Sequence, residues 1–167
     1  MKRFFLFYDE AILLRLRRLH KPWAIRMART FTHVGDTTSW FFFAFAMLAA
    51  GQTKTAFLMG FGAGIASGLA QAVKRVAKRP RPSAGIKGFE ALVDNPDAFS
   101  FPSGHTAAAI GIAIAVAGTP IGPATLALAC LIAVSRVYLG AHYPLDVMAG
   151  AALGTLAGIA SRLLLGA

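Results

Sequence analysis

The sequence predicts an all-α fold: an integral membrane helical bundle of about five to six spans with an N-terminal interfacial amphipathic helix. Of the 167 residues, 56% are hydrophobic and only 14% are charged, and the mean hydropathy is +0.60. Such values lie outside the usual range of soluble globular proteins. The apolar residues also fall into blocks near the roughly 20 residues that cross a bilayer. We expect a single domain at 1–167, with an interfacial segment at 1–30 and the transmembrane bundle at 31–167.

The N-terminal segment is basic and amphipathic. Residues 9–20 mix leucine and isoleucine with arginine, which predicts a helix in the membrane interface, with Asp9 as its N-cap. The aromatic residues of this segment suit the headgroup zone, and they are Phe4, Phe5, Phe7, Tyr8 and Trp23. A short soluble helix is the alternative. Residues 1–8 lack the apolar core of a cleavable signal peptide.

Five apolar segments predict the membrane spans. The first covers residues 37–50 and is short, so we expect it to reach back toward Phe31, with Asp36 as its cap. The others are expected at 55–73, 106–118, 121–139 and 145–165. Glycine recurs every fourth residue in the second and last spans, which favours close helix packing. These glycines are Gly60, Gly64, Gly68, Gly150, Gly154 and Gly158.

The positive charge is concentrated beside the apolar segments. The net charge is +10, and eight of the 17 cations lie between Lys2 and Arg29, with five more between Lys74 and Arg81. We therefore expect membrane lipid and the bilayer as partners, with no nucleic acid; the oligomeric state stays open. The single cysteine, Cys130, has no disulfide partner and is expected to pack in the interior.

Polar residues near the span ends should meet on one side of the membrane. In an alternating bundle, the ends of the second and fourth spans face the same side as the starts of the third and fifth. This side gathers Lys74, Arg81, Ser103, Gly104, His105, Arg136, His142 and Asp146. Cations and free amides at a helix start can hold a phosphate, while one histidine attacks phosphorus and the other protonates the leaving oxygen. An aspartate can orient the attacking imidazole.

The spacing of these residues resembles a known family. The segment from Lys74 to Pro82 reads K-x6-R-P, residues 102–105 read P-S-G-H, and Ser135 to Asp146 reads S-R-x5-H-x3-D. Together these motifs are similar to those of the type 2 phosphatidic acid phosphatase superfamily, in its membrane lipid phosphatase branch. The resemblance covers residues 74–146 by motif and extends to residue 165 by helix pattern.

The resemblance implies a role for each site residue. His142 would be the nucleophile, Asp146 its orienting partner and His105 the general acid, later the base. The substrate phosphate would be bound by Lys74, Arg81, Ser103, Gly104 and Arg136. The implied activity is hydrolysis of a lipid phosphate or diphosphate through a phosphohistidine, with no metal and no cofactor. Candidate substrates are an isoprenoid diphosphate, phosphatidylglycerophosphate and phosphatidate.

Other functions remain open at this point. A phosphotransferase could pass the phosphate from His142 to a lipid or sugar acceptor, and a non-enzymatic lipid-binding protein could keep the fold. A vanadium haloperoxidase has a similar site, but those proteins are larger and soluble. The resemblance suggests the bacterial inner membrane with the site outside the cytoplasm, whereas the basic N-terminal segment argues for the opposite face.

Several further residues carry weaker expectations. His33 and Asp36 are interpreted as capping and surface residues, and the loop acids Glu90, Asp94 and Asp97 as solvated. Lys78 and Arg79 could contact a headgroup or face water. The three loop aromatics, Phe89, Phe99 and Phe101, are expected to pack within the loop rather than shape a lipid entrance.

Overall fold

The computed structural model describes residues 2–95 and 97–167, with side chains from residue 8 onward. The described residues form helices and connecting loops, with one isolated bridge between Pro80 and Phe99 as their only β pairing. The helices are α1 (Lys2–Arg17), α2 (Pro22–Val34), α3 (Thr37–Ala49), α4 (Thr53–Ala77), α5 (Pro82–Gly85), α6 (Gly104–Ala115), α7 (Gly122–Tyr138) and α8 (Pro144–Leu164). The predicted all-α fold is confirmed.

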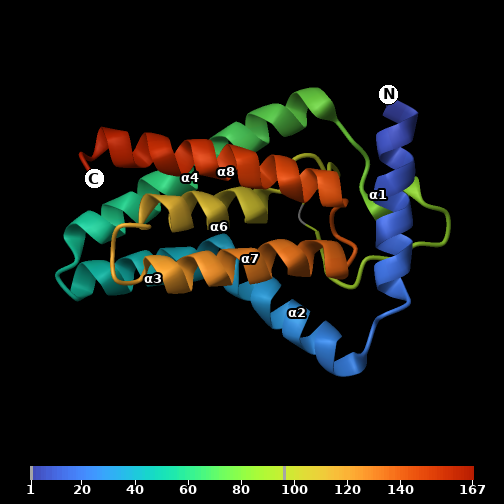
Figure 1. Cartoon of the computed structure of the whole chain (residues 1–167), viewed down its shortest axis with the longest axis horizontal. Helices are drawn as coiled ribbons and strands as arrows, with labels where there is room; N and C mark the ends of the chain where they lie inside the picture. Colours follow the sequence, from blue (N-terminus) through green and yellow to red (C-terminus); the bar gives the residue numbers. More distant parts are fainter. Residues whose placement is uncertain (1, 96) are drawn as a thin grey trace.

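Helix α6 lies at the centre of the bundle. It packs against α8, α4 and α7, and Figure 1 shows these helices running side by side with α1 standing across one end. The sequence of α6 consists largely of alanine, glycine and isoleucine, and most of its residues are buried. Small side chains allow several neighbouring helices to approach at once. The first residues of α6 therefore lie at the centre of the bundle and face the end that α1 crosses.

Close helix contacts occur at some predicted glycines and not at others. A Cβ at Gly154 would lie 2.5 Å from the Ala107 carbonyl, and Gly150 and Gly158 are equally crowded against α6. In α4 the prediction is wrong, because Gly60, Gly64 and Gly68 have open space beside them. The glycine in contact there is Gly62, where a Cβ would lie 2.7 Å from the Gly111 carbonyl. The face of α4 that contacts α6 is thus a different face from the one that carries Gly60, Gly64 and Gly68.

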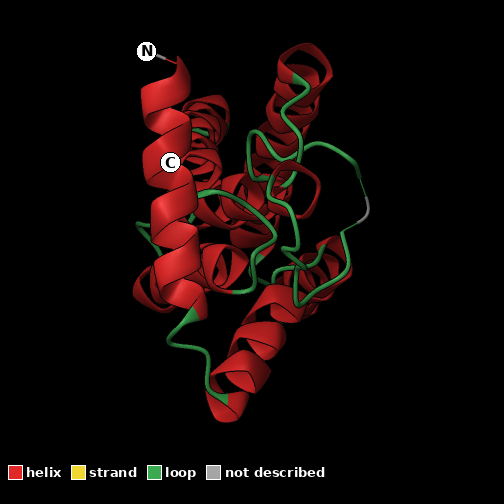
Figure 2. Ribbon diagram, turned by 90° about the vertical axis from the view of Figure 1, so that its right-hand side faces the viewer, coloured by secondary structure: helices red, strands yellow, loops and turns green. Residues whose placement is uncertain are grey.

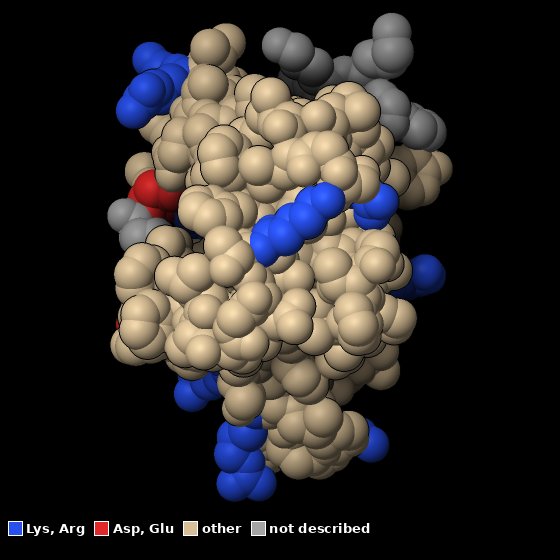
Figure 3. All heavy atoms as spheres, turned by 90° about the vertical axis from the view of Figure 1, so that its left-hand side faces the viewer, with Lys and Arg blue, Asp and Glu red and all other residues tan. Residues whose placement is uncertain are grey.

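The outer surface of the bundle is apolar. Phe41, Phe57, Leu126 and Leu156 are among the exposed large hydrophobic side chains. In Figure 3, which faces the end away from α1, neutral residues cover most of the surface. Two helices, α4 with 25 residues and α8 with 21, are long and apolar enough to cross a membrane, while α3, α6 and α7 are shorter apolar helices. Five spans therefore stay a prediction.

Three local expectations were wrong. Helix α1 begins at Lys2, so Asp9 lies inside it and does not cap it. The first span does not reach Phe31 as one helix, because extended backbone at Asp36 (φ −69°, ψ 151°) separates α2 from α3. Cys130 is exposed on the outer face of α7, where an apolar thiol can face hydrocarbon as readily as protein.

A long connection covers the α1 end of the bundle. Lys78 adopts a left-handed conformation (φ 45°) that ends α4, and the chain then runs through α5 to the start of α6. Figure 2 faces this end and shows the loops gathered there beside α1. Phe89 is buried with Leu13 and Tyr143, as expected for a loop aromatic that packs within the protein. The predicted irregular loop thus forms a folded cover over the helix ends.

Candidate active site

One cavity at this end brings together most of the predicted site residues. It has a volume of about 380 Å³, and its lining includes Lys74, Arg81, Gly104, His105, Arg136 and His142. These residues come from the ends of α4 and α7, the start of α6, and the loops after α4 and before α8. The expected convergence of these helix ends and starts at one end of the bundle is therefore confirmed. Ser103 and Asp146 are fully buried and do not line this cavity.

The His142 ring is held in one tautomer by its neighbours. Its Nδ1 lies 2.7 Å from the Ser100 carbonyl oxygen, which only accepts hydrogen bonds, so Nδ1 carries the hydrogen. Its Nε2 lies 3.4 Å from Nη1 of Arg81, a donor, so the lone pair is on Nε2. Burial, together with the charges of Arg136 and Arg81 and against the pull of Asp146, lowers the pKa of His142 to about 4. At neutral pH this imidazole is an uncharged base.

Asp146 holds the turn beside His142 more closely than it holds the ring. Its Oδ2 accepts the Tyr143 backbone N–H at 2.9 Å but lies 3.7 Å from Nδ1 of His142. The two residues do not share a helix face, because α8 begins at Pro144 and His142 lies in the preceding turn. Asp146 is therefore placed to stabilise a positively charged imidazole through its charge, while the Ser100 carbonyl accepts the direct hydrogen bond.

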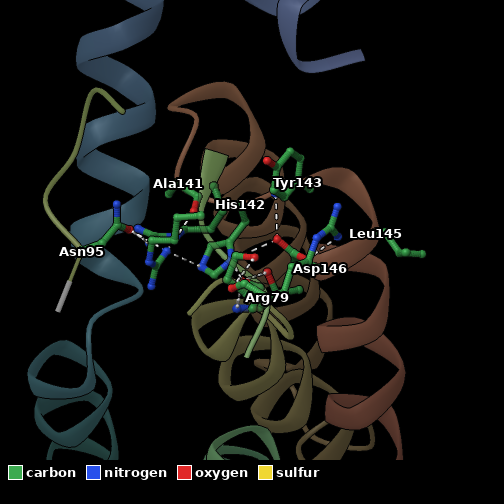
Figure 4. Close-up of polar contacts among 12 residues, drawn as sticks. Arg79, Asn95, Ala141, His142, Tyr143, Leu145 and Asp146 are labelled. Atoms are coloured by element: carbon green, nitrogen blue, oxygen red, sulfur yellow. Dashed lines mark hydrogen bonds and ion pairs between the residues drawn. The ribbon is translucent and has the colours of Figure 1, made fainter. Parts of the chain in front are cut away.

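Arg79 and Asp9 form a buried network behind Asp146 that the sequence did not predict. Nη1 of Arg79 donates to Oδ1 of Asp146 and Nη2 to Oδ2 of Asp9, both at 2.7 Å. Asp9 also accepts the Leu145 backbone N–H at 3.0 Å, and the guanidinium lies over the Tyr143 ring at 4.0 Å from its centroid. Figure 4 shows Arg79 beside Asp146 in this network. Arg79 thus neither faces water nor reaches outward to a headgroup.

The three predicted phosphate-binding cations are held by the loop before α6. The Asp97 carboxylate accepts from Nζ of Lys74 at 2.6 Å and from Nη2 of Arg81 at 2.7 Å. Asn95 Oδ1 accepts from Arg81 at 2.9 Å and from Nη2 of Arg136 at 3.0 Å. Burial acts to raise the pKa of Asp97, but the hydrogen bonds and charges of the two cations hold it below its usual value. The view of Asp97 as a solvated acid was wrong, and Asn95 was missed.

The Nε donor of Arg136 has no partner among the described residues and can serve a ligand. Its side chain is buried, Nη1 donates to the Thr32 hydroxyl, and Nε has no hydrogen-bond partner among the described residues. A buried N–H without an acceptor costs about 1 to 3 kcal/mol. An anion in the cavity that Arg136 lines would supply such an acceptor.

Ser103 and Gly104 differ in what they can offer to a phosphate. The Ser103 N–H donates to the Asp146 carbonyl at 2.9 Å, and its hydroxyl accepts from Thr106 as the N-cap of α6. Its amide is therefore occupied, contrary to the predicted free donor. Gly104 lines the cavity, and a Cβ there would meet nothing within 4 Å. The start of α6 remains suited to an anion at Gly104.

His105 has a carboxylate partner far away in the sequence. Its Nε2 lies 2.8 Å from Oδ1 of Asp36, and Oδ2 of Asp36 lies 3.2 Å from Nδ1 of His33. Asp36 precedes α3 but makes no side-chain capping bond. Asp36 therefore occupies the N-cap position without capping through its side chain. It is 45% exposed, as expected for a surface residue, but it also contacts a site histidine, which was not expected. No local spacing links positions 36 and 105.

Known proteins match the chain over most of its length. The family model of the PAP2 superfamily, named for type 2 phosphatidic acid phosphatases, matches residues 55–166. The chain belongs to the PAP2 superfamily. This confirms the resemblance drawn from the three motifs.

Relatives and solved structures agree with this membership. The chain is 35% identical over 147 residues to decaprenylphosphoryl-5-phosphoribose phosphatase of Mycolicibacterium smegmatis, covering 85% of this chain and 81% of the relative. It is 29% identical over 166 residues to phosphatidylglycerophosphatase B of Bacillus subtilis, covering 89% and 78%. The crystal structure of a transmembrane PAP2 phosphatidylglycerolphosphate phosphatase from Bacillus subtilis superimposes with a TM-score of 0.82 at 26% identity, covering 95% and 85%. The protein is a hydrolase of this superfamily that acts on lipid phosphates.

Proposed function

We propose that the protein removes a terminal phosphate from a membrane lipid by way of phospho-His142. The observation that carries this proposal is the placement of the His142 Nε2 lone pair beside Arg81, in a cavity also lined by Lys74 and Arg136. A neutral, oriented imidazole next to three cations is suited to attack a phosphorus atom whose oxygens those cations hold.

The reaction then follows in two steps. The Nε2 lone pair of His142 forms a bond to phosphorus while the bond from phosphorus to the lipid oxygen breaks. His105 donates a proton to that oxygen. A water then attacks phospho-His142, its proton passes to His105, and the bonding electrons return to the His142 ring. Lys74, Arg81, Arg136 and the amide of Gly104 hold the phosphate in both steps, and no metal or cofactor takes part.

Binding of phosphate requires the loop contacts to rearrange. Asp97 and Asn95 accept hydrogen bonds from the same cations, Lys74, Arg81 and Arg136, that would hold the phosphate. A phosphate dianion offers more acceptor oxygens and more charge than one carboxylate. We therefore expect the phosphate to replace Asp97 as the acceptor at Lys74 and Arg81.

The substrate is proposed to be a lipid because the cavity continues into apolar surface. Beyond the polar residues, its lining includes Trp40, Phe41, Met59 and Ala63 from α3 and α4. A hydrocarbon chain could lie along this part while its phosphate reaches the cations. The relatives are named for an isoprenoid phosphoribose and for phosphatidylglycerophosphate, so both an isoprenoid and a diacylglycerol chain are candidates.

Phosphate release from purified protein tests this function. The panel would contain an isoprenoid phosphate, an isoprenoid diphosphate, phosphatidylglycerophosphate and phosphatidate, each with His142→Ala as control. We expect at least one substrate to be turned over more than about 100-fold faster than by the control. No release from any substrate would contradict the proposal. Appearance of phosphate on an added lipid alcohol, in place of free phosphate, would favour the phosphotransferase.

The membrane face is proposed to be the extracytoplasmic one. The positive charges nearest the site are engaged inside the protein, since Lys74 and Arg81 pair with Asp97, and Arg79 pairs with Asp9 and Asp146. Such charges should be left out of the positive-inside comparison, which concerns loops. A Lys87→Cys reporter in a Cys130→Ala background should react with an impermeant thiol reagent in intact cells. Reaction only after lysis would place the site in the cytoplasm.

A further inference from the structure

Asp36 contacts the second site histidine from a different part of the chain. The carboxylate lies in the break between α2 and α3, whereas His105 is the second residue of α6. Oδ1 of Asp36 is 2.8 Å from Nε2 of His105, so this contact is shorter than the 3.7 Å between Asp146 and His142. The His105 side chain is 21% exposed and lines the cavity. Each site histidine thus has its own aspartate.

We infer that Asp36 is a positioning residue for the general acid, acting through His105. This inference rests on the proposed function and adds to it a residue that the three sequence motifs do not contain. With Nε2 bonded to Asp36, Nδ1 is the ring atom left for the substrate oxygen. The carboxylate determines which ring nitrogen donates the proton and holds the ring in position. The aspartate of a Ser-His-Asp triad orients its histidine in the same way.

The charges around His105 explain why it needs a carboxylate. Burial of the ring and the charges of Arg136 from α7 and Lys74 from α4 all disfavour a proton on His105, and Asp36 favours it. On the far side of Asp36, His33 contacts the other carboxylate oxygen. Burial acts to raise the pKa of Asp36, but its hydrogen bonds to His105 and His33 hold the pKa below its usual value. Asp36 is therefore charged at neutral pH and offsets the cations that bind the phosphate.

The inference assigns the proton movements to specific atoms. In the first step the proton on Nδ1 of His105 passes to the lipid oxygen as the bond between phosphorus and oxygen breaks. In the second step water gives a proton back to Nδ1 as it attacks phospho-His142. Nε2 keeps its hydrogen bonded to Asp36 throughout, so the carboxylate stabilises the charged ring before the first step and after the second.

The test compares two leaving groups in the intact protein. Asp36→Asn should slow formation of the phosphoenzyme from a lipid alkyl phosphate by about 100-fold. The leaving group of this substrate is an alkoxide, which needs a proton to depart. Formation from p-nitrophenyl phosphate should stay within about threefold of wild type, because nitrophenolate leaves without one. Rapid-quench measurement gives both rates on the same preparation. Their ratio does not depend on how much of the variant is folded.

Two reference variants separate the possible outcomes. His33→Asn changes the exposed contact to the same carboxylate and should leave both rates within about threefold of wild type. His105→Ala should show the same leaving-group dependence as Asp36→Asn, and a larger one. Equal slowing of both substrates by Asp36→Asn, or no slowing, would overturn the inference while leaving the proposed function intact. Equal slowing by His105→Ala would instead overturn the proposed role of His105.

Discussion

The buried Arg79 network should contribute strongly to the stability of the fold as well as position the site. Arg79 lies between two carboxylates, Asp9 and Asp146, which are 5% and 0% exposed. Arg79→Ala leaves both acids without their cation and removes the ring contact to Tyr143. Loss of one partner from a buried ion pair costs roughly 3 to 5 kcal/mol. We expect the variant to lose about that much stability, which is a large part of the stability of a typical domain.

Unfolding in detergent, followed by circular dichroism with increasing denaturant, measures this loss. Arg75→Ala is the matched control, because Arg75 is an exposed arginine four residues earlier, and its change should stay within about 0.5 kcal/mol of wild type. Asp9→Asn combined with Arg79→Ala should cost less than the sum of the single changes, by at least about 1 kcal/mol. A loss below about 1 kcal/mol for Arg79→Ala, or additive costs in the double variant, would refute the described network.

Three further predictions concern the chemistry of the site. Asp146→Asn should fold and bind substrate but lose turnover by about 10³-fold, as measured by kcat and KM, because it weakens stabilisation of the charged His142 ring; near-normal kcat would remove that role. Phosphate release should persist in excess chelator and be inhibited by vanadate, whereas loss restored by a divalent ion would indicate metal-assisted hydrolysis. Burial lowers the pKa of His142 from 6.5 to about 4 in the folded protein. As the pH falls, His142 is therefore protonated in the unfolded chain before it is protonated in the folded protein. The free energy of unfolding should be unaffected by His142 above pH 6.5 and should fall by roughly 3 kcal/mol toward pH 4 because of this group. Denaturant unfolding of His142→Asn with the same pH dependence as wild type would contradict this.

The sequence predicted the parts of the site that lie at helix ends. Apolar segment lengths determine which ends share a side, so the convergence of Lys74, His105, Arg136 and His142 followed from alternation alone. The spacing of the motifs then indicated the family. These predictions succeed because they depend on the order of spans and on local residue chemistry, which are readable along the chain.

The contacts that position those residues were missed because they join distant segments. Asp9 meets Arg79, and Asp36 meets His105, only after α1 and the break between α2 and α3 have docked on the bundle. Each aspartate alone was interpreted as a helix cap, the commonest role for that residue near a helix start. Asn95 likewise lies in a polar loop, and nothing in its neighbourhood indicates contact with Arg136.

The assignment of His142 as nucleophile also depends now on a different observation. The motif resemblance implied His142 as the nucleophile with Asp146 as its orienting partner, yet both histidines have an aspartate in the structure. What distinguishes His142 is the Ser100 carbonyl on Nδ1, which leaves the Nε2 lone pair beside Arg81. The sequence could not reveal this, because every residue has a backbone carbonyl and nothing in the sequence marks the one that contacts His142.

The central claim is a phosphoryl group carried by His142, and direct trapping of that group tests it most directly. The protein is mixed with p-nitrophenyl phosphate whose phosphoryl group carries radioactive phosphorus, and the reaction is quenched rapidly in alkali, which preserves phosphohistidine. The label should remain on wild-type protein and on His105→Ala, be released by acid, and be absent from His142→Ala. Acid-labile label on the His142→Ala protein would contradict the account and make His105, or another group, the nucleophile.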